Sequence, residues 1–390
     1  MSFFLQPPGV VCAAGPDLAS LREAVFADQP AGVAANGTVW PGHVLHLGAV
    51  NTVLPSVEHL PLPQRSRNNA LLLAALAQIR GAVDGAVARH GADRVGVVLG
   101  TSTSGVGESE VAIAALARDG RLPAGFHVEQ QELGSPALLL AELLGLGGPR
   151  YVVSTACSSG AKALASGARL LRAGLCDAVL VGGVDALCGM TVAGFTALES
   201  VDAARCRPMS ATRAGINIGE GAALFVLSRE PSAVRLSGWG ESSDAHHISA
   251  PEPTGRGALA AMREALDRAG LAPADIGYLN LHGTATPQND AMESRAVAEL
   301  FGLALPCSST KPLTGHALGA AGAIEAAIAW LTVTGDGRLP VHHFDGERDA
   351  GLPPIALVAP GQRLAAAPCH VMSNSFAFGG NNASLVLSHV

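Results

Sequence analysis

The chain has 390 residues, of which 48% are hydrophobic and 4% aromatic, and its formal net charge is −7 at neutral pH. That hydrophobic share is enough for a large core, and the negative charge argues against a nucleic-acid partner. Because aromatic residues are scarce, the core must consist of Ala, Val, Leu and Gly, which suits helices packed closely on a parallel sheet.

The N-terminus and the longest apolar runs indicate a cytoplasmic protein without membrane insertion. The first fifteen residues are interrupted by Pro7 and Pro8 and carry no basic segment, so they make a poor signal peptide. The runs 70–77 and 137–146 are shorter than the roughly 18 residues that a membrane span needs. The seven cysteines are odd in number and form no CxxC pair, so neither a disulfide framework nor a zinc site is predicted.

The first part of the chain predicts alternating strands and helices. Hydrophobic periodicity gives a strand over 3–13, a helix over 17–26, a helix over 65–83, a fully buried strand over 94–99 followed by a polar loop, and a helix over 136–146. The Pro- and Gly-rich region up to about residue 63 has no clear pattern. A parallel sheet is the natural environment for the buried run RVGVVL.

The next segment, YVVSTACSSGAKALASGARLLRAG, predicts a strand-to-helix turn around Cys157. Residues 151–153 predict a buried strand, and small apolar residues recur at helical spacing from Ala161 until Gly174. A helix start offers unpaired backbone N–H groups and a positive dipole end, so a thiolate is stabilised there and an oxyanion can be bound nearby. Cys157 is therefore a candidate nucleophile in a turn like a nucleophile elbow; the alternative is an ordinary buried cysteine.

The rest of the chain completes the first half and then predicts a second, similar half. A strand over 178–181 completes a βαβ unit, 191–221 is rich in loops, and a strand over 222–227 closes the first half. The sequence then predicts a loop from 238, a helix over 256–269, a strand over 278–281, a strand-turn-helix unit over 305–331 and a final strand pair around NSFAFGGNN. Because the 305–331 unit has the same design as the Cys157 unit, a duplication with halves 1–232 and 233–390 is predicted.

Four polar turns, at Cys157, His282, 311–316 and 374–380, each follow a predicted buried strand. In an open α/β sheet such turns gather at the carboxyl ends of the strands, so one thiol and the imidazoles of His282 and His316 come within reach of one another. A lone histidine at a strand end is more often structural. Two of them in the turns HGTATP and TGHALGAAG, together with the cysteine, favour a catalytic site.

Four segments resemble the signature turns of the β-ketoacyl-[acyl-carrier-protein] synthases, the elongating condensing enzymes of the thiolase superfamily: TACSSG, LHGTATPQND, SSTKPLTGHALGAAGAIEA and SNSFAFGGNNASL. With SSDAHH and the GEGA turn, the resemblance covers most of residues 90–390. It implies an α/β protein with a thiolase-like, five-layered αβαβα fold made of two similar halves, and usually a dimer. It also implies a Cys/His/His site, no bound cofactor, and substrates carried on the phosphopantetheine of an acyl carrier protein.

The residue chemistry agrees with the condensation that this resemblance implies. A cysteine thiolate can accept an acyl group from another thioester in a nearly isoenergetic exchange, so Cys157 would carry the growing chain. The new carbon–carbon bond needs an enolate, which forms when a malonyl thioester loses CO₂. Neutral imidazole N–H groups of His282 and His316 can hold its oxygen, each worth about 2 to 4 kcal/mol in the transition state, and no metal is needed. The product would be a 3-oxoacyl carrier protein.

The resemblance assigns supporting roles to further residues. The backbone N–H groups of Cys157 and Phe378 would form the oxyanion hole, and the Phe378 ring would gate the acyl tunnel. Lys311 lies 14 residues before Glu325, and this pair would orient the site and balance its charge. The alternative for the pair is a buried ion pair that only fixes the fold.

Binding residues follow from the same resemblance. Thr284 and Thr286 match the hydroxyls that hold the phosphopantetheine arm, while Asp290 and Glu293 in the same turn have a structural role in our interpretation. Carrier proteins of this family are acidic, and this chain is acidic too, so docking needs a local basic patch. The candidates, each equally well a solvated surface charge, are Arg65, Arg67, Arg205 and Arg207.

Some positions depart from the fatty-acid elongating members of this family. The segment RPMSATRAGINIGEGA carries Met209, Ser210 and Ala214 after the Arg-Pro, where an aromatic residue and an acidic pair are usual. The gate turn begins with Ala377, where glycine is usual. These details resemble specialised synthases of aryl-polyene or type II polyketide pathways.

Alternatives for function and assembly stay open at this point. The chain-length-factor subunits found beside some synthases share the fold without catalysis, but they replace the nucleophile that Cys157 supplies here. Thiolases use a second cysteine in the closing turn, and initiating synthases have Asn at the third site position, where this chain has His316. The sequence does not decide the acyl chain, or between a homodimer and a heterodimer with a homologous subunit.

Overall fold

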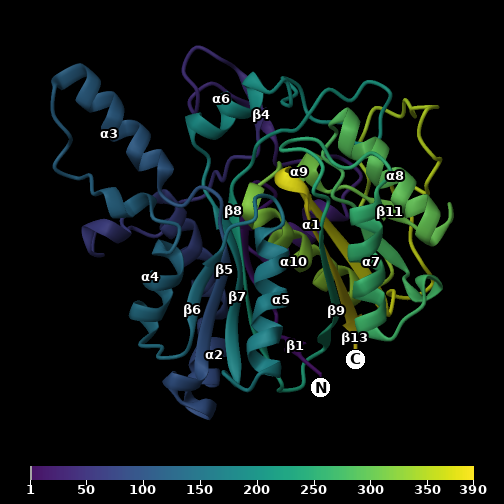
Figure 1. Cartoon of the computed structure of the whole chain (residues 1–390), viewed down its shortest axis with the longest axis horizontal. Helices are drawn as coiled ribbons and strands as arrows, with labels where there is room; N and C mark the ends of the chain where they lie inside the picture. Colours follow the sequence, from purple (N-terminus) through teal and green to yellow (C-terminus); the bar gives the residue numbers. More distant parts are fainter. Residues whose placement is uncertain (1) are drawn as a thin grey trace.

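The computed structural model describes residues 2–390, which form a five-layered α/β structure (Figure 1). Two layers of strands alternate with three layers of helices in the order αβαβα. Eleven strands within the described residues are linked by hydrogen bonds, and the short strand β1 (Phe4–Leu5) joins the two layers because it pairs with both. The predicted fold class is confirmed.

The first strand layer is built from the N-terminal part of the chain. Its spatial order is β8 (Gly221–Ser228), β7 (Ala178–Asp185), β5 (Val95–Gly100) and β6 (Arg150–Val153), with β2 (Gly9–Cys12) also paired to β8. Strands β7, β5 and β6 are parallel, and β8 is antiparallel to β7. The outer face is covered by α2 (Arg67–His90) and α4 (Ser135–Leu144), whose leucines pack against the strands.

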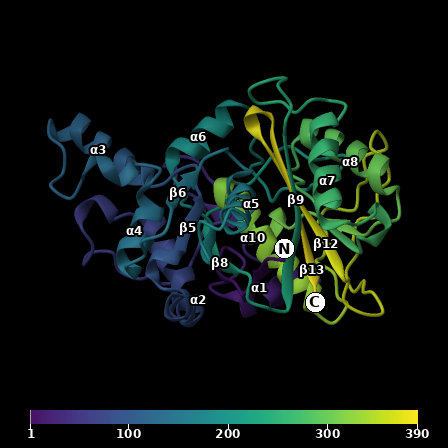
Figure 2. The same ribbon diagram turned by 60° about the horizontal axis from the view of Figure 1, so that its bottom comes forward.

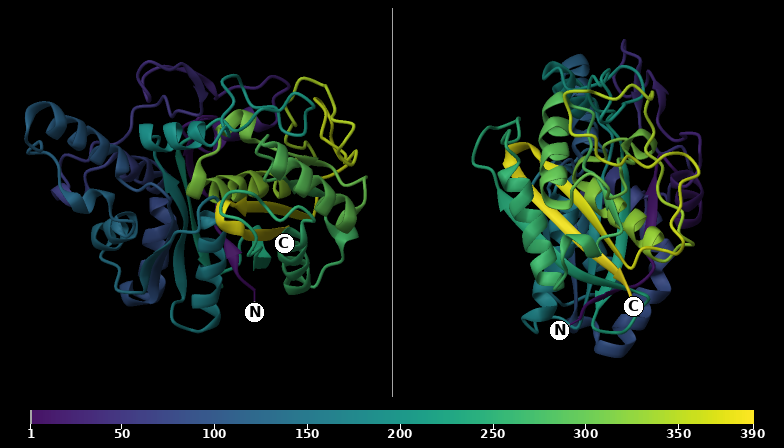
Figure 3. Two further views of the ribbon diagram at one scale, coloured as in Figure 1. Left: turned by 45° about the horizontal axis from the view of Figure 1, so that its top comes forward. Right: turned by 90° about the vertical axis from the view of Figure 1, so that its right-hand side faces the viewer.

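The second strand layer is built from the C-terminal part. Its order is β9 (Val234–Ser243), β13 (Asn381–His389), β12 (His370–Ala377), β10 (Tyr278–Asn280) and β11 (Cys307–Ser308). Figure 3 shows the long antiparallel pair β12 and β13, in yellow, along this side of the molecule. The outer face is covered by α7 (Arg256–Ala269) and α8 (Pro287–Phe301).

The central layer consists of α5 (Ser159–Arg172) and α10 (Ala321–Val333), which pack against each other between the strand layers. Glycines permit the close approach. A Cβ atom at Gly160 would lie 2.8 Å from the Ala323 nitrogen, and one at Gly322 would lie 2.8 Å from the Ala161 nitrogen. The N-terminal ends of the two central helices therefore meet, which places the turns before them side by side.

The remaining elements lie around these layers. They are α1 (Leu18–Val25), the hairpin of β3 (Ala34–Asn36) and β4 (Leu45–Leu47), α3 (Val106–Asp119), α6 (Gly189–Ala197) and α9 (Lys311–Thr314). Figure 2 shows α3 reaching away from the strand layers, with α6 between it and the central helices. Helix α3 begins where the sequence predicted only a polar loop.

Helix α2 is long and apolar enough to cross a membrane by length and composition alone. A core helix of a globular protein meets the same test. Here the buried side of α2 packs on the first strand layer through residues such as Leu72 and Leu76.

Several predicted elements differ from the observed ones. The predicted strand 3–13 is two strands, because Pro7 and Pro8 between them offer no N–H to a ladder. The predicted helix 65–83 continues to His90. The strand 151–153 was predicted to be buried, which is wrong: β6 is an edge strand, and Tyr151 is 38% exposed.

Several elements were not predicted. The sequence predicts loop from residue 238, where β9 continues to Ser243, and from residue 191, where α6 lies. Helices α3 and α8 and the hairpin of β3 and β4 have no predicted counterpart. Helix α6 has the sequence GMTVAGFTA, in which Gly, Thr and Val have low helix propensity, so its contacts with the rest of the fold stabilise it.

Candidate active site

Cys157 lies in a sharp turn between β6 and α5, as the sequence predicted. Ala156, directly before it, has a φ of 51°, a left-handed conformation that a residue with a side chain adopts only when its surroundings impose it. The Ser159 hydroxyl secures the turn, since it donates to the Ala156 carbonyl at 2.6 Å and accepts the Thr155 N–H at 2.9 Å. Cys157 is therefore held at the head of the central helix α5.

The two histidines come from the C-terminal half of the chain and meet the cysteine there. His282 follows β10, and His316 follows α9. Their ring centroids are 5.3 Å apart at an interplanar angle of 82°, and both side chains are buried. The Cys157 sulfur and one nitrogen of each ring all lie within 4.8 Å of one another. The structure thus brings the three predicted residues together.

A cavity of about 140 Å³ opens beside these three side chains. Thr284 and Thr286 line it, and their hydroxyl oxygens are 2.9 Å apart. Phe378, in the short turn η6 (Phe378–Gly380), lines it as well, and its ring packs against Phe195 with centroids 5.4 Å apart. The predicted pantetheine and gate residues therefore share one cavity with Cys157.

Both imidazoles are uncharged near neutral pH. Burial, together with the positive charge of Lys311, lowers the pKa of His282 and of His316 well below the usual 6.5. The Nδ1 atom of His316 is buried without a hydrogen-bond partner among the described residues. Neutral rings with free nitrogen atoms can donate N–H groups to a ligand oxygen in the cavity.

The cysteine is a neutral thiol in the resting site. Burial raises the pKa of Cys157 to about 11, and this outweighs the Lys311 charge and the backbone N–H groups of Phe378 and Cys157, which lower it. The backbone N–H groups at the helix start stabilise the thiolate, as the sequence predicted, but desolvation of the sulfur is the larger effect. The same two N–H groups point at the sulfur, where the sequence predicted the oxyanion hole.

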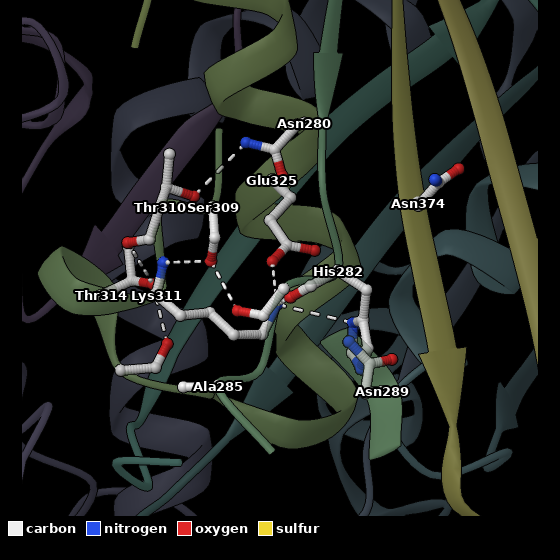
Figure 4. Close-up of polar contacts among 12 residues, drawn as sticks. Asn280, His282, Ala285, Asn289, Ser309, Thr310, Lys311, Thr314, Glu325 and Asn374 are labelled. Carbon is white, nitrogen blue, oxygen red and sulfur yellow. Dashed lines mark hydrogen bonds and ion pairs between the residues drawn. The ribbon is translucent and has the colours of Figure 1, made fainter. Parts of the chain in front are cut away.

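Lys311 and Glu325 form a buried ion pair beside His282. The distance from Lys311 Nζ to Glu325 Oε1 is 2.6 Å, and the two side chains are 1% and 2% exposed (Figure 4). The ammonium also donates to the His282 carbonyl at 2.5 Å and lies 3.5 Å from its Nδ1. This ion pair is thus in direct contact with a residue of the site.

The carboxylate of Glu293, on α8, holds the backbone of the His282 turn. It accepts the N–H of His282 at 2.8 Å and that of Gly283 at 2.7 Å. Burial raises the pKa of Glu293 to about 7. Asp290, one turn earlier, accepts the N–H groups of Met209 and Ala285, two residues with positive φ. These contacts agree with the structural roles expected for both carboxylates.

The four arginines predicted as a docking patch each make contacts within the chain. Arg65 pairs with Glu58 at 3.3 Å, and the Arg67 guanidinium pairs with the buried Glu220 at 2.5 Å. Arg205 donates to three backbone carbonyls, those of Ala31, Val33 and Pro312. Arg207 pairs with Asp202 at 3.2 Å. Arg65, Arg67 and Arg207 are thus paired with carboxylates, whereas Arg205 is paired only with carbonyls among the described residues.

Two residues of the site region were not predicted. Asp185, at the end of β7, is fully buried and accepts hydrogen bonds from Thr101, Thr103 and the Gly319 N–H, so it ties β5 to the start of α10. An acidic residue ending an apolar strand, as in LVGGVD, was the available signal. Phe195 on α6 had no local signal, because its partner Phe378 lies 183 residues further along the chain.

Family models match most of the chain. The beta-ketoacyl synthase N-terminal domain matches residues 50–233, and the beta-ketoacyl synthase C-terminal domain matches residues 233–345. The 3-oxoacyl-[acyl-carrier-protein] synthase 2 of Staphylococcus aureus is 33% identical over 353 residues, which cover 84% of this chain and 86% of that protein. The protein of the same name from Coxiella burnetii is 33% identical over 319 residues, which cover 77% of this chain and 76% of that protein.

Solved structures are similar over the whole chain. The ketosynthase ApeO in complex with its chain length factor ApeC, from Xenorhabdus doucetiae, matches with a TM-score of 0.95 and 45% identity over 100% of this chain and 98% of that one. The ishigamide ketosynthase/chain length factor matches with a TM-score of 0.87 and 27% identity over 100% of this chain and 99% of that one. With its Cys/His/His cluster in a thiolase-like fold, this chain belongs to the β-ketoacyl synthase family of acyltransferases.

Proposed function

We propose that the chain catalyses the decarboxylative Claisen condensation of an acyl group held on Cys157 with a malonyl carrier protein, which gives 3-oxoacyl carrier protein and CO₂. The observation that carries the proposal is a buried sulfur within 4.8 Å of two uncharged imidazoles beside a cavity. The alternative, a non-catalytic chain-length-factor-type subunit, would have no use for this cluster.

In the first step, the Cys157 sulfur attacks the carbonyl of an acyl thioester on the carrier. The carbonyl oxygen gains negative charge, which the backbone N–H groups of Cys157 and Phe378 stabilise. The bond to the pantetheine sulfur breaks, and the proton from the Cys157 thiol ends on that departing sulfur. Because the thiol is neutral at rest, its proton must leave the sulfur as the new bond forms.

In the second step, malonyl carrier protein loses CO₂, and the electron pair of the broken bond forms an enolate. N–H groups of His282 and His316 hold its oxygen. The enolate carbon then attacks the acyl carbonyl on Cys157, the carbon–sulfur bond breaks, and the cysteine leaves as a thiolate. That thiolate takes up one proton from solvent and returns to the thiol, because burial raises the pKa of Cys157 to about 11.

The other site residues take binding and orienting roles in this proposal. Thr284 and Thr286 hold the phosphopantetheine arm at the cavity, and Phe378 gates it. Lys311 and Glu325 orient His282 through the contacts of the ammonium with its carbonyl and ring. The cluster of Cys157, His282 and His316 also has the donor set of a zinc site; we propose that it works without a metal and that no cofactor is bound.

A second subunit of the same fold is proposed to cover the edge strand β6. Tyr151 on β6 and Leu138 on α4 are 38% and 41% exposed, and both line a cavity of about 660 Å³ on this face. An apolar edge strand left open is a site for pairing with another chain. The partner is a second copy or a homologous subunit, and the similar ApeO structure contains a chain length factor.

Charge substitutions on this face test the assembly. Leu138→Asp combined with Tyr151→Asp is expected to convert a dimer into a monomer, because two carboxylates would be buried at the interface. Light scattering after size exclusion measures the mass, with Leu303→Asp as a control at an exposed leucine elsewhere. A wild-type monomer that dimerises only with a homologous subunit would identify a heterodimer. An unchanged dimer in the double variant would contradict this interface.

The protein works in the cytoplasm in this proposal. Its N-terminal half, 1–232, contributes the nucleophile, and its C-terminal half, 233–390, contributes the two histidines. An acyl carrier protein docks through Arg65, Arg67, Arg205 and Arg207, of which Arg205 has no carboxylate partner among the described residues. The 45% identity to a ketosynthase that is paired with a chain length factor favours a specialised aryl-polyene or type II polyketide pathway over housekeeping synthesis.

The direct test combines acyl-loaded carrier, malonyl-loaded carrier and the purified protein, together with its homologous subunit if one is required. Mass spectrometry is expected to detect 3-oxoacyl carrier protein and CO₂ release. Cys157→Ala is expected to abolish the product, because no acyl group can be transferred to the enzyme. Product formation by Cys157→Ala at the wild-type rate would overturn the proposal.

A further inference from the structure

Helix α6 is held at its N-terminus by a residue from outside the helix. The backbone N–H groups of Gly189 and Met190 both donate to the carboxylate of Glu110 on α3, the first at 2.9 Å. The residue at the N-cap position, Cys188, supplies no side-chain acceptor. Because the first N–H groups of a helix have no partner within it and attract negative charge, Glu110 acts as the cap of α6.

The other end of α6 supports the gate. Phe195 lies near its C-terminal end and packs against the Phe378 ring, with centroids 5.4 Å apart and planes at 46°. Both rings line the cavity that contains Cys157. Between the two ends, Val192 is buried in a small apolar cluster with Leu318. A shift of α6 would therefore change how far the Phe378 ring can move.

Helix α3, which carries Glu110, is an outlying element. Its main contacts with other elements are with α6 and with the turn η3 (Val128–Gln131). Val111 and Ile113 on α3 are 68% and 62% exposed. Figures 1 and 2 both show α3 projecting from the body on the side where α6 lies. The Glu110 carboxylate is thus a polar link from this outlying helix to the helix that supports the gate.

We propose that Glu110 is a positioning residue for the gate: by capping α6 it fixes Phe195 and so limits the opening of Phe378 over Cys157. The inference deepens the proposed function, since the value of a gate rests on the acyl transfer proposed above. Loss of the cap should affect which groups reach the sulfur and leave the steps after acylation unchanged.

Alkylation of Cys157 measures gate opening without any natural substrate. Peptide mass spectrometry follows the rate of modification by small iodoacetamide and by bulky N-benzylmaleimide, with the exposed Cys369 as internal reference. Glu110→Ala is expected to raise the bulky-to-small rate ratio at Cys157 about fivefold, the factor that corresponds to loss of one helix cap. Glu110→Gln keeps one acceptor oxygen and should give an intermediate ratio. Asp119→Ala, which removes another carboxylate of α3 without contact to α6, should leave it unchanged.

The link through Phe195 is tested by a double-mutant cycle. In a Phe195→Ala background, the substitution Glu110→Ala is expected to have no further effect on the ratio, because the side chain that transmits it is gone. An equal effect in both backgrounds would overturn the proposal. The proposal would also be overturned if Glu110→Ala or Glu110→Gln lowered the melting temperature but left the bulky-to-small rate ratio at Cys157 as in the wild type. Failure of the wild type to form 3-oxoacyl product would defeat the proposed function instead, and the alkylation result would still decide the role of Glu110.

Discussion

Replacing His282 or His316 by alanine is expected to leave acyl transfer to Cys157 largely intact and to slow loss of CO₂ from malonyl carrier protein by roughly 30- to 1,000-fold. That range corresponds to about 2 to 4 kcal/mol for one N–H donor to a developing oxyanion in a preorganised site. Intact-protein mass spectrometry measures the acyl adduct, and CO₂ release measures the second step. These two measurements separate the role of Cys157 as the nucleophile from the role of the histidines as N–H donors to the enolate oxygen.

The pH dependence provides a further check on the histidines. Because their pKa values lie well below 6.5, the rings stay neutral as the pH falls from about 7 to about 6. The decarboxylation rate should therefore fall over that range only as far as protonation of Glu293, whose pKa is about 7, loosens the His282 turn. The control for the two alanine variants is His389→Ala, at an exposed site near the C-terminus, which should behave as wild type in both measurements. If neither histidine variant forms an acyl adduct, the histidines act in the first step, and the assignment to decarboxylation is wrong.

Replacing Lys311 by methionine is expected to destabilise the protein by about 3 to 5 kcal/mol, because Glu325 would be left as an unpaired buried carboxylate. The double variant Lys311→Met with Glu325→Leu is expected to recover most of that stability, since a well-packed apolar pair can replace a buried ion pair. Urea unfolding measures stability, and CO₂ release measures activity. The double variant should remain slow, because no ammonium then contacts His282.

This pair of variants separates the two interpretations of the buried ion pair. If the double variant recovers activity together with stability, the Lys311–Glu325 pair only fixes the fold. If stability returns and activity does not, the contacts of Lys311 Nζ with the His282 carbonyl and Nδ1 are needed to orient the ring. The structure favours the second result, since the ammonium donates to both Glu325 and His282.

Much of the fold could be predicted where the signal is local. Helix α7 was predicted at 256–269, the residues that it occupies, because its apolar positions recur at helical spacing until Gly270 ends it in a left-handed conformation. The turn around Cys157 was predicted for the same kind of reason. Helix α6 was not, because Gly, Thr and Val dominate it and its cap, Glu110, lies 79 residues earlier.

The amino-acid sequence by itself determined which side chains are candidates for the chemistry and in which turns they lie, because a nucleophile turn or a helix end is encoded within a few neighbouring residues. Only the tertiary structure decided that burial raises the pKa of Cys157, that β6 is an exposed edge, and that Phe195 packs on Phe378. Protonation and exposure depend on how much water the whole fold removes from a group. Burial and long-range contacts are properties of the packed layers, so no local pattern could reveal them.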